Sequence, residues 1–300
     1  MFTVAVSSRA LFNLEDGNAI YQTQGAAAFN AYMRESETKA LRPGVAFSVV
    51  KKLLALNTPG ERDRVEVILL SSNTLEAGAR VLNSARHYGL DIERAFCTSG
   101  GDRIGLAQAA NVTLFLSTNP SEVRKALAAG IASASVMTES RCGANVENDE
   151  SSVLCVAFDG DAVLFDDSAE KVNQAEGLRA FQESERRQAE IPLGAGPFYQ
   201  VLMALYAIQQ EFAEAGLPCP LRLALVTARG VKAYDRVLRT FRAWAVGVDE
   251  ALFCGGLPKG PFLAALRADL FFDDTMHNIE SAVQFVPTCH VPNGVVGATQ

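Results

Sequence analysis

The sequence has no long uninterrupted apolar run and no excess of positive charge. Its longest apolar stretches, at residues 65–70 and 266–272, are broken by charged side chains and fall far short of the roughly 20 residues that cross a bilayer. With 34 acidic against 27 basic side chains the net charge is -7, so no broad basic face is available for a nucleic-acid polymer or an anionic membrane. We therefore expect neither a membrane span nor a nucleic-acid partner.

The sequence also has no CxxC spacing and no signal-peptide pattern. Its six cysteines are scattered, which favours buried thiols over a disulfide or zinc framework. The N-terminal residues run through an apolar segment directly into Ser7, Ser8 and Arg9, a pattern typical of a strand. We expect a cytoplasmic protein whose 300 residues, 49% of them hydrophobic, make about two domains with a sizeable core.

The two halves of the chain resemble each other. A shift of 152 positions aligns residues 4–55 with residues 156–207 without a gap, and about a quarter of the pairs are identical, more than composition alone would give. Identical pairs include Val4/Val156, Phe29/Phe181 and Gly44/Gly196. We expect a tandem duplication with units at 1–150 and 151–300, joined by a polar linker at 138–152. Two unrelated units that share only apolar patterning are the alternative.

Short apolar runs alternate with helical patterns within each unit. In the second unit, runs at 153–158, 221–226 and 269–272 read as strands, and residues 196–212 and 231–246 have helical patterns. This alternation predicts an α/β fold with a parallel sheet and helices on both faces. Because ligands bind at the carboxyl ends of such strands, the residues that directly follow each apolar run are the candidate site residues.

Two of these runs end in groups suited to phosphoryl transfer. Asp159 and Asp161 follow the first run, where one carboxylate can act as nucleophile and form an aspartyl-phosphate while the other transfers a proton. Thr227 and Ala228 follow the next run and offer a hydroxyl and a backbone N–H to phosphate oxygens.

The remaining strand ends supply a cation and an acidic pair. Lys259 precedes a helical segment, whose N-terminus also favours anions. Asp273 and Asp274 follow the last apolar run and are the hard oxygen ligands that Mg²⁺ prefers. An EF-hand loop beginning at Asp159 is disfavoured, because Val163 falls at a ligand position.

These motifs resemble those of the haloacid dehalogenase superfamily of phosphatases, whose members carry DxDx(T/V), then Ser or Thr, then Lys, then an acidic pair. The likeness is greater to the type I cytosolic 5′-nucleotidase family, and it rests on segments spread along the whole chain, at residues 5–12, 157–165, 192–197, 225–229, 271–274 and 290–296. The resemblance implies a Rossmann-like haloacid dehalogenase fold with a helical cap, here at about 166–220. It also implies Mg²⁺-dependent hydrolysis of nucleoside 5′-monophosphates to nucleoside and phosphate.

The resemblance assigns a role to each candidate residue. Asp159 would be the nucleophile and Asp161 the acid and base, with phosphate held by Thr227, the Ala228 N–H and Lys259. Arg229 would be a substrate contact. Mg²⁺ would be bound by four residues: Asp159, the backbone carbonyl of Asp161, Asp273 and, in support or as an alternative ligand, Asp274.

The first unit lacks this chemistry at the matched positions. Arg9 stands opposite Asp161, and a guanidinium cannot transfer the proton. The other mismatches are Ser7 opposite Asp159, Asp102 opposite Lys259, and Ser117–Thr118 opposite Asp273–Asp274. We expect this degenerate unit to be inactive by itself, to build its own parallel sheet, and to bring Ser7, Ser71 and Ser117 together at one edge. Whether Ser71 retains an anion site or only packs stays open.

Two other functions remain open at this point. A phosphatase of another small phosphomonoester, such as a sugar phosphate, would use the same motifs, because the selecting contacts lie in the cap. A non-catalytic nucleotide-sensing protein would fit the degenerate first unit. The sequence also leaves open the base preference, any effector and a homo-oligomeric state.

Overall fold

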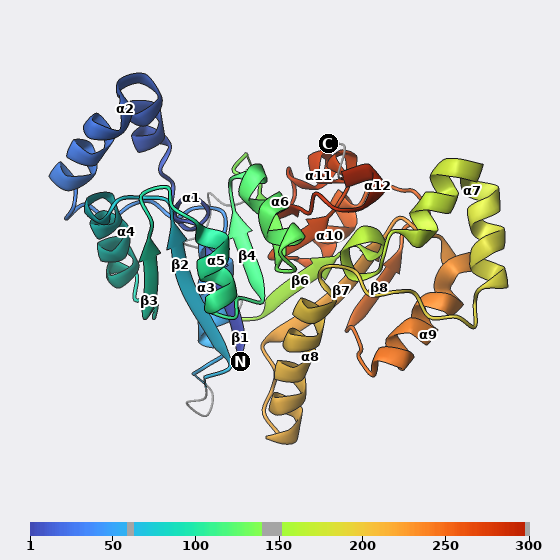
Figure 1. Cartoon of the computed structure of the whole chain (residues 1–300). Helices are drawn as coiled ribbons and strands as arrows, with labels where there is room; N and C mark the ends of the chain where they lie inside the picture. Colours follow the sequence, from blue (N-terminus) through green and yellow to red (C-terminus); the bar gives the residue numbers. More distant parts are fainter. Residues whose placement is uncertain (59–62, 140–151, 298–300) are drawn as a thin grey trace.

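The computed structural model describes residues 1–58, 63–139 and 152–297, which form a ten-stranded sheet (Figure 1). The strands are β1 (Phe2–Val6), β2 (Val65–Ser71), β3 (Arg94–Cys97), β4 (Leu114–Ser117), β5 (Ala132–Val136), β6 (Leu154–Phe158), β7 (Leu221–Thr227), β8 (Glu250–Phe253), β9 (Leu270–Asp273) and β10 (Thr288–His290). The apolar runs of the sequence therefore form strands, as predicted.

The sheet is continuous across both halves of the chain. Its strand order is β3-β2-β1-β4-β5-β10-β9-β6-β7-β8, so the order in the second half mirrors that in the first. Neighbouring strands within each half are parallel, whereas β5 and β10 pair antiparallel through Ser135 with His290 and Val136 with Cys289. The expectation that each half builds a separate sheet is therefore wrong: this antiparallel pair joins the two into one.

Helices alternate with the strands and cover both faces of the sheet. They are α1 (Ser8–Leu11), α2 (Glu15–Glu35), α3 (Phe47–Ala55), α4 (Leu75–His87), α5 (Arg103–Ala109), α6 (Pro120–Ala128), α7 (Ser168–Arg187), α8 (Tyr199–Glu214), α9 (Tyr234–Trp244), α10 (Gly260–Leu266), α11 (Met276–Ala282) and α12 (Gly294–Gly297). The α/β class predicted from the alternation is confirmed, with the sheet mostly parallel.

The alternation of side chains along each strand divides the core between two faces. In β1, Val4 and Val6 enter a core cluster shared by both halves, to which α3, α4, α8 and α9 contribute. Ala5 points to the opposite face, where α5 and α6 cover the first half. A separate cluster under α10 and α11 covers that face of the second half. The halves are thus fused by one common apolar layer as well as by the sheet.

The segment expected to form a cap, residues 166–220, contains two different helices. Helix α8 buries Val201, Leu202 and Leu205 in the shared core, so it belongs to the layer under the sheet. Helix α7 stands away from the sheet in Figure 1 and bends at Gly177, whose φ of 81° lies in the left-handed region that favours glycine. Helix α2 bends in the same way at Gly25, with φ 83°. Of the expected segment, α7 is the part that stands away from the sheet.

The predicted linker and Cys142 lie largely or wholly within residues 140–151, outside the described residues, as does the predicted boundary at 150 and 151. The five described cysteines are free, and Cys155, Cys254 and Cys289 are buried. In the described part of the chain, no helix is long and apolar enough to span a membrane.

Candidate active site

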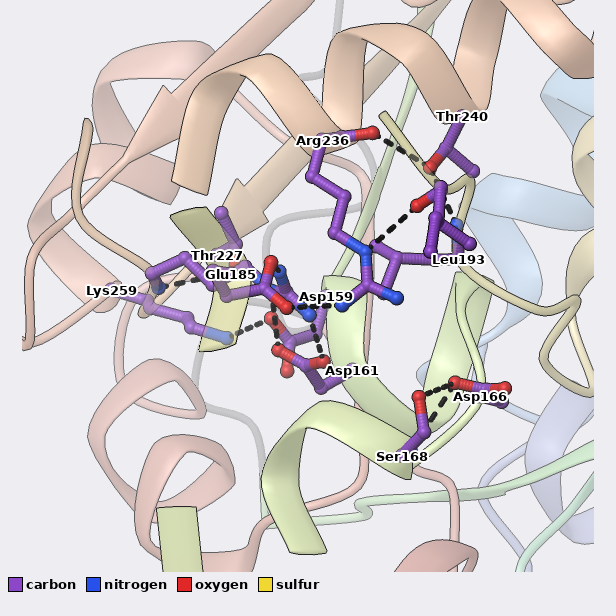
Figure 2. Close-up of polar contacts among 12 residues, drawn as sticks. Asp159, Asp161, Asp166, Ser168, Glu185, Leu193, Thr227, Arg236, Thr240 and Lys259 are labelled. Atoms are coloured by element: carbon purple, nitrogen blue, oxygen red, sulfur yellow. Dashed lines mark hydrogen bonds and ion pairs between the residues drawn. The ribbon is translucent and has the colours of Figure 1, made fainter. Parts of the chain in front are cut away.

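A buried lysine joins two carboxylates at the carboxyl ends of β6 and β9. Lys259, at the start of α10, places its Nζ 2.6 Å from Asp159 Oδ1 (Figure 2). The same Nζ lies 2.6 Å from Asp273 Oδ2. The side chains of Lys259 and Asp273 are fully buried. The second Asp273 oxygen accepts from Thr275 N at 2.8 Å and Asn278 Nδ2 at 3.1 Å. A buried lysine needs such partners, because an unpaired charge inside a protein is costly.

Three carboxylates gather around this lysine. Asp159, Asp273 and Asp274 each offer an oxygen within 4.8 Å of the others, and all three residues are buried. Lys259 supplies one positive charge against their three negative charges, which leaves the group short of cations. Clustered carboxylate oxygens of this kind are the donors that Mg²⁺ takes. The residues present therefore fit a hard divalent cation.

The crowding of these acids shifts their protonation. Burial raises the pKa of Asp159 to about 7; Lys259 opposes this shift, and the neighbouring Asp273 adds to it. Burial raises the pKa of Asp274 to about 9, with further contributions from Asp159 and Asp273. Burial by itself would lower the pKa of Lys259, but the two paired carboxylates raise it above its usual value. The lysine therefore stays charged, and the acids bind protons readily when no cation is present.

The loop after β6 lies tightly against the end of β7. A Cβ on Gly160 would lie 3.1 Å from the Phe165 ring and 3.3 Å from Thr227 Oγ1, so a larger residue would push the threonine hydroxyl away. Thr227 is buried and its Oγ1 accepts from Arg229 N at 3.2 Å. Ala228, between them, is exposed. The end of β7 thus places the Thr227 hydroxyl beside Gly160, the residue after Asp159. The exposed Ala228 comes next in the chain.

Four charged side chains form a continuous row of ion pairs that links the site to helices α7 and α9. They are Asp161, Arg229, Glu185 and Arg236. Arg229 binds both oxygens of Asp161, through Nε at 2.8 Å and Nη2 at 2.6 Å. Its Nη1 contacts Glu185 of α7, and the other Glu185 oxygen accepts from Arg236 of α9. Glu185 is 2% exposed. Figure 2 shows the contact of Glu185 with Arg236. Helix α7 and the site are therefore connected by ion pairs of alternating sign.

The C-terminal segment supports the loop that carries Asp161. Asn293 Nδ2 donates to Ala162 O at 2.8 Å, and a Cβ on Gly294 would lie 2.7 Å from the Ala162 side chain. His290 Nε2 lies 2.9 Å from Asp274 O. Burial lowers the pKa of His290, so the ring is neutral at ordinary pH and donates through Nε2. Residues 290–294 thus hold the loop and the acidic pair in place.

Comparison with known proteins agrees with this arrangement. The model of the 5′-nucleotidase family matches residues 1–298 of the chain. The chain belongs to the 5′-nucleotidase family. It is 39% identical over 289 residues to human cytosolic 5′-nucleotidase 1B, an alignment that covers 93% of this chain and 47% of the human protein. The chain thus spans about half the length of this curated relative. The search of solved structures gave no significant match.

This family membership confirms the resemblance predicted from the sequence. Five of the predicted site residues are neighbours in the structure. Asp159, Thr227, Lys259, Asp273 and Asp274 lie together at the strand ends.

Two predicted residues, Asp161 and Arg229, pair with each other, a contact that the sequence did not predict. The Asp161 carboxylate is outside the acidic trio and is paired with Arg229. The Arg229 guanidinium, expected to face the substrate, is held by Asp161 and Glu185 inside the protein.

Sequence reasoning missed Glu185 and Arg236. Glu185 lies in a strongly polar helix with many charged neighbours, and nothing in its spacing distinguishes it from a solvated residue. The only available signal is the burial of α7 against the site, which requires the fold.

Proposed function

We propose that the second half of the chain is a Mg²⁺-dependent phosphatase that hydrolyses nucleoside 5′-monophosphates to nucleoside and phosphate through an aspartyl-phosphate. The observation that carries the proposal is the buried Lys259 held between Asp159 and Asp273, with Asp274 beside them. Family membership and the likeness to the human cytosolic 5′-nucleotidase support the substrate class.

In the proposed mechanism Asp159 attacks phosphorus and expels the 5′-oxygen. The Thr227 hydroxyl, the Ala228 N–H and Lys259 hold the phosphate oxygens, and the charge of Lys259 favours the approach of a dianionic phosphate to a carboxylate. A second step, in which water attacks the aspartyl-phosphate, restores Asp159 and releases phosphate.

Asp161 supplies the proton to the leaving oxygen and later removes one from water. Arg229 binds both oxygens of its carboxylate and so holds it in one orientation beside Asp159 for both steps. Glu185 offers the same guanidinium a second carboxylate, so Asp161 can take up a proton without leaving Arg229 buried and unpaired. We therefore assign Arg229 and Glu185 a positioning role; a direct contact of Arg229 with substrate remains an alternative proposal.

The proposed metal would be held by Asp159, Asp273, Asp274 and the backbone carbonyl of Asp161. When bound, Mg²⁺ would neutralise charge on the phosphate oxygens. Its binding would also compensate the surplus of buried carboxylates around Lys259.

Asp273→Asn is expected to raise the Mg²⁺ concentration for half-maximal activity by about tenfold or more, because one anionic ligand is lost. The measurement is phosphate release from AMP as Mg²⁺ is titrated. The matched control is Asp91→Asn, which changes an exposed acid in the first half of the chain. This variant should behave as wild type. An unchanged titration for Asp273→Asn would remove this residue from the metal site.

Mg²⁺ binding is expected to release protons and to strengthen as the pH rises from 6 to 9. The pKa of Asp159 is raised to about 7 and that of Asp274 to about 9, so the metal-free protein carries protons that a cation must displace.

The same raised pKa values imply that the folded metal-free protein binds more protons than the unfolded chain, so its stability falls with rising pH.

Calorimetric titration of Mg²⁺ in buffers of different ionisation enthalpy measures the proton release on metal binding directly. Affinity that is independent of pH would contradict the assignment.

A substrate panel separates the proposed function from its alternatives. Purified protein with Mg²⁺ is offered AMP, IMP, glucose 6-phosphate and ribose 5-phosphate, and kcat/KM is measured for each. We expect a nucleoside monophosphate to exceed both sugar phosphates by at least about tenfold. A preference for a sugar phosphate would support the second candidate, and the absence of any turnover would support a nucleotide-sensing role.

We also propose that the two halves, 1–150 and 151–300, arose by tandem duplication and that the first copy is degenerate. The mirrored strand order and the matching bends at Gly25 and Gly177, 152 positions apart, support this. Residues with positive φ also recur 156 positions apart, as the pairs Gly89/Ala245, Gly100/Gly256 and Asn111/Arg267.

The cytoplasm stays the proposed compartment of this protein, in keeping with the name of the human relative.

A further inference from the structure

The first half contains a pocket of about 420 Å³ at the carboxyl ends of its strands. Ser7, Ser72 and Ser117, which follow or end β1, β2 and β4, line it. Ser71 lies just behind, where its Oγ is 2.7 Å from that of Ser8, another lining residue. The pocket occupies the place in this half that the acidic trio occupies in the other, and its volume is in the usual range for small-molecule sites.

One wall of the pocket comes from α2 and combines aromatic rings with amides. Tyr21 and Phe29 lie edge to face with their ring centroids 6.1 Å apart, and Tyr21 is 49% exposed. Asn18, Gln22 and Asn30 line the same wall. An exposed ring with amide groups around it suits a flat heteroaromatic group that stacks and forms hydrogen bonds.

Two arginines also line the pocket. Arg9 Nη2 donates a hydrogen bond to Glu15 at 2.8 Å, and Arg103 Nη2 donates one to Glu122. The Nε atoms of both arginines are buried, and no hydrogen-bond partner for them is present in the described residues. Each guanidinium carries five N–H donors, so its single glutamate leaves donors for a further anion. Phosphate is one of the anions whose geometry this fork-shaped group matches.

Nothing at this edge could replace the acidic trio. Ser7 stands where the other half has Asp159, and among the described residues the metal-type acidic cluster is that of Asp159, Asp273 and Asp274. The acid that lines the pocket, Glu122, is occupied by Ser117 Oγ at 3.1 Å and by Arg103. A ligand here would meet neither a metal site nor a nucleophilic carboxylate.

We propose that this first-half pocket binds a nucleoside phosphate without a metal ion and without hydrolysing it. Tyr21 stacks on the base, and Arg9 and Arg103 hold the phosphate. This goes beyond the proposed function, because it assigns a second ligand site to the half without catalytic residues.

The test is calorimetric titration of the full chain in EDTA with AMP, adenosine and inorganic phosphate as separate probes. In EDTA the proposed metal site of the second half lacks its cation, and the variants below decide whether the AMP that binds occupies the first-half pocket. We expect one AMP per chain, with AMP recovered intact, and binding at least about tenfold tighter than that of adenosine or phosphate alone. AMP that fails to bind in EDTA would overturn the proposal.

Two variants locate the binding. Arg9→Gln and Tyr21→Ser change exposed side chains, and each is expected to weaken AMP binding in EDTA by about tenfold. Lys125→Gln removes an exposed charge outside the pocket and should leave it unchanged. AMP binding that neither pocket variant alters would contradict the assignment. Failure of the proposed phosphatase activity would instead appear as absent phosphate release with Mg²⁺, a separate assay.

Discussion

Replacing Asp159 with Asn is expected to lower phosphate release from AMP by about 10³-fold or more, since an amide of nearly the same shape cannot form the aspartyl-phosphate. The fold should persist, because Asp159 N still donates to Phe272 O and Lys259 keeps its contact with Asp273. Steady-state kinetics with Mg²⁺ and a thermal melt measure both effects.

The exposed acid Asp91, changed to Asn, provides the control for this substitution. Activity of Asp159→Asn within tenfold of wild type would show that this carboxylate is not the nucleophile.

Replacing Glu185 with Gln is expected to destabilise the protein by roughly 3 kcal/mol and to lower its Tm by about 10 °C. The glutamate is almost fully buried between Arg229 and Arg236, and its loss leaves two guanidinium groups with one carboxylate fewer. Because Arg229 also holds Asp161, kcat should fall as well, and its pH profile should shift.

Glu190→Gln is the matched control for this second prediction. Glu190 pairs with Arg239 at the surface, where its side chain is 76% exposed, and such pairs contribute little to stability. If Glu185→Gln melted at the wild-type temperature, the buried chain of ion pairs would not connect the cap to the site.

The strands and the acidic site could be predicted because their signals are local. Each apolar run in 153–158, 221–226 and 269–272 is followed directly by a polar residue, and parallel strands bring those ends to one edge. The joining of the halves could not be predicted, because β10 has three residues and its antiparallel partner β5 is far away in the sequence. Short strands have no periodicity to detect, and their pairing depends on the whole fold.

The surroundings of Arg229 could not be predicted either. The sequence placed this residue beside the phosphate loop, and it does follow β7 there. Its guanidinium turns to Glu185 because α7 packs over the site and brings in a carboxylate from 44 residues upstream. Likewise, the family resemblance predicts one helical cap over 166–220, whereas the apolar face of α8 lies in the shared core.

The measurement that tests the central claim most directly is phosphate release from AMP by the purified chain, with Mg²⁺ and with EDTA. We expect turnover that requires the cation, because a cation would compensate the surplus negative charge of the buried trio of Asp159, Asp273 and Asp274. Turnover that is equal in EDTA, or no turnover of AMP or any other nucleoside 5′-monophosphate with Mg²⁺, would contradict it.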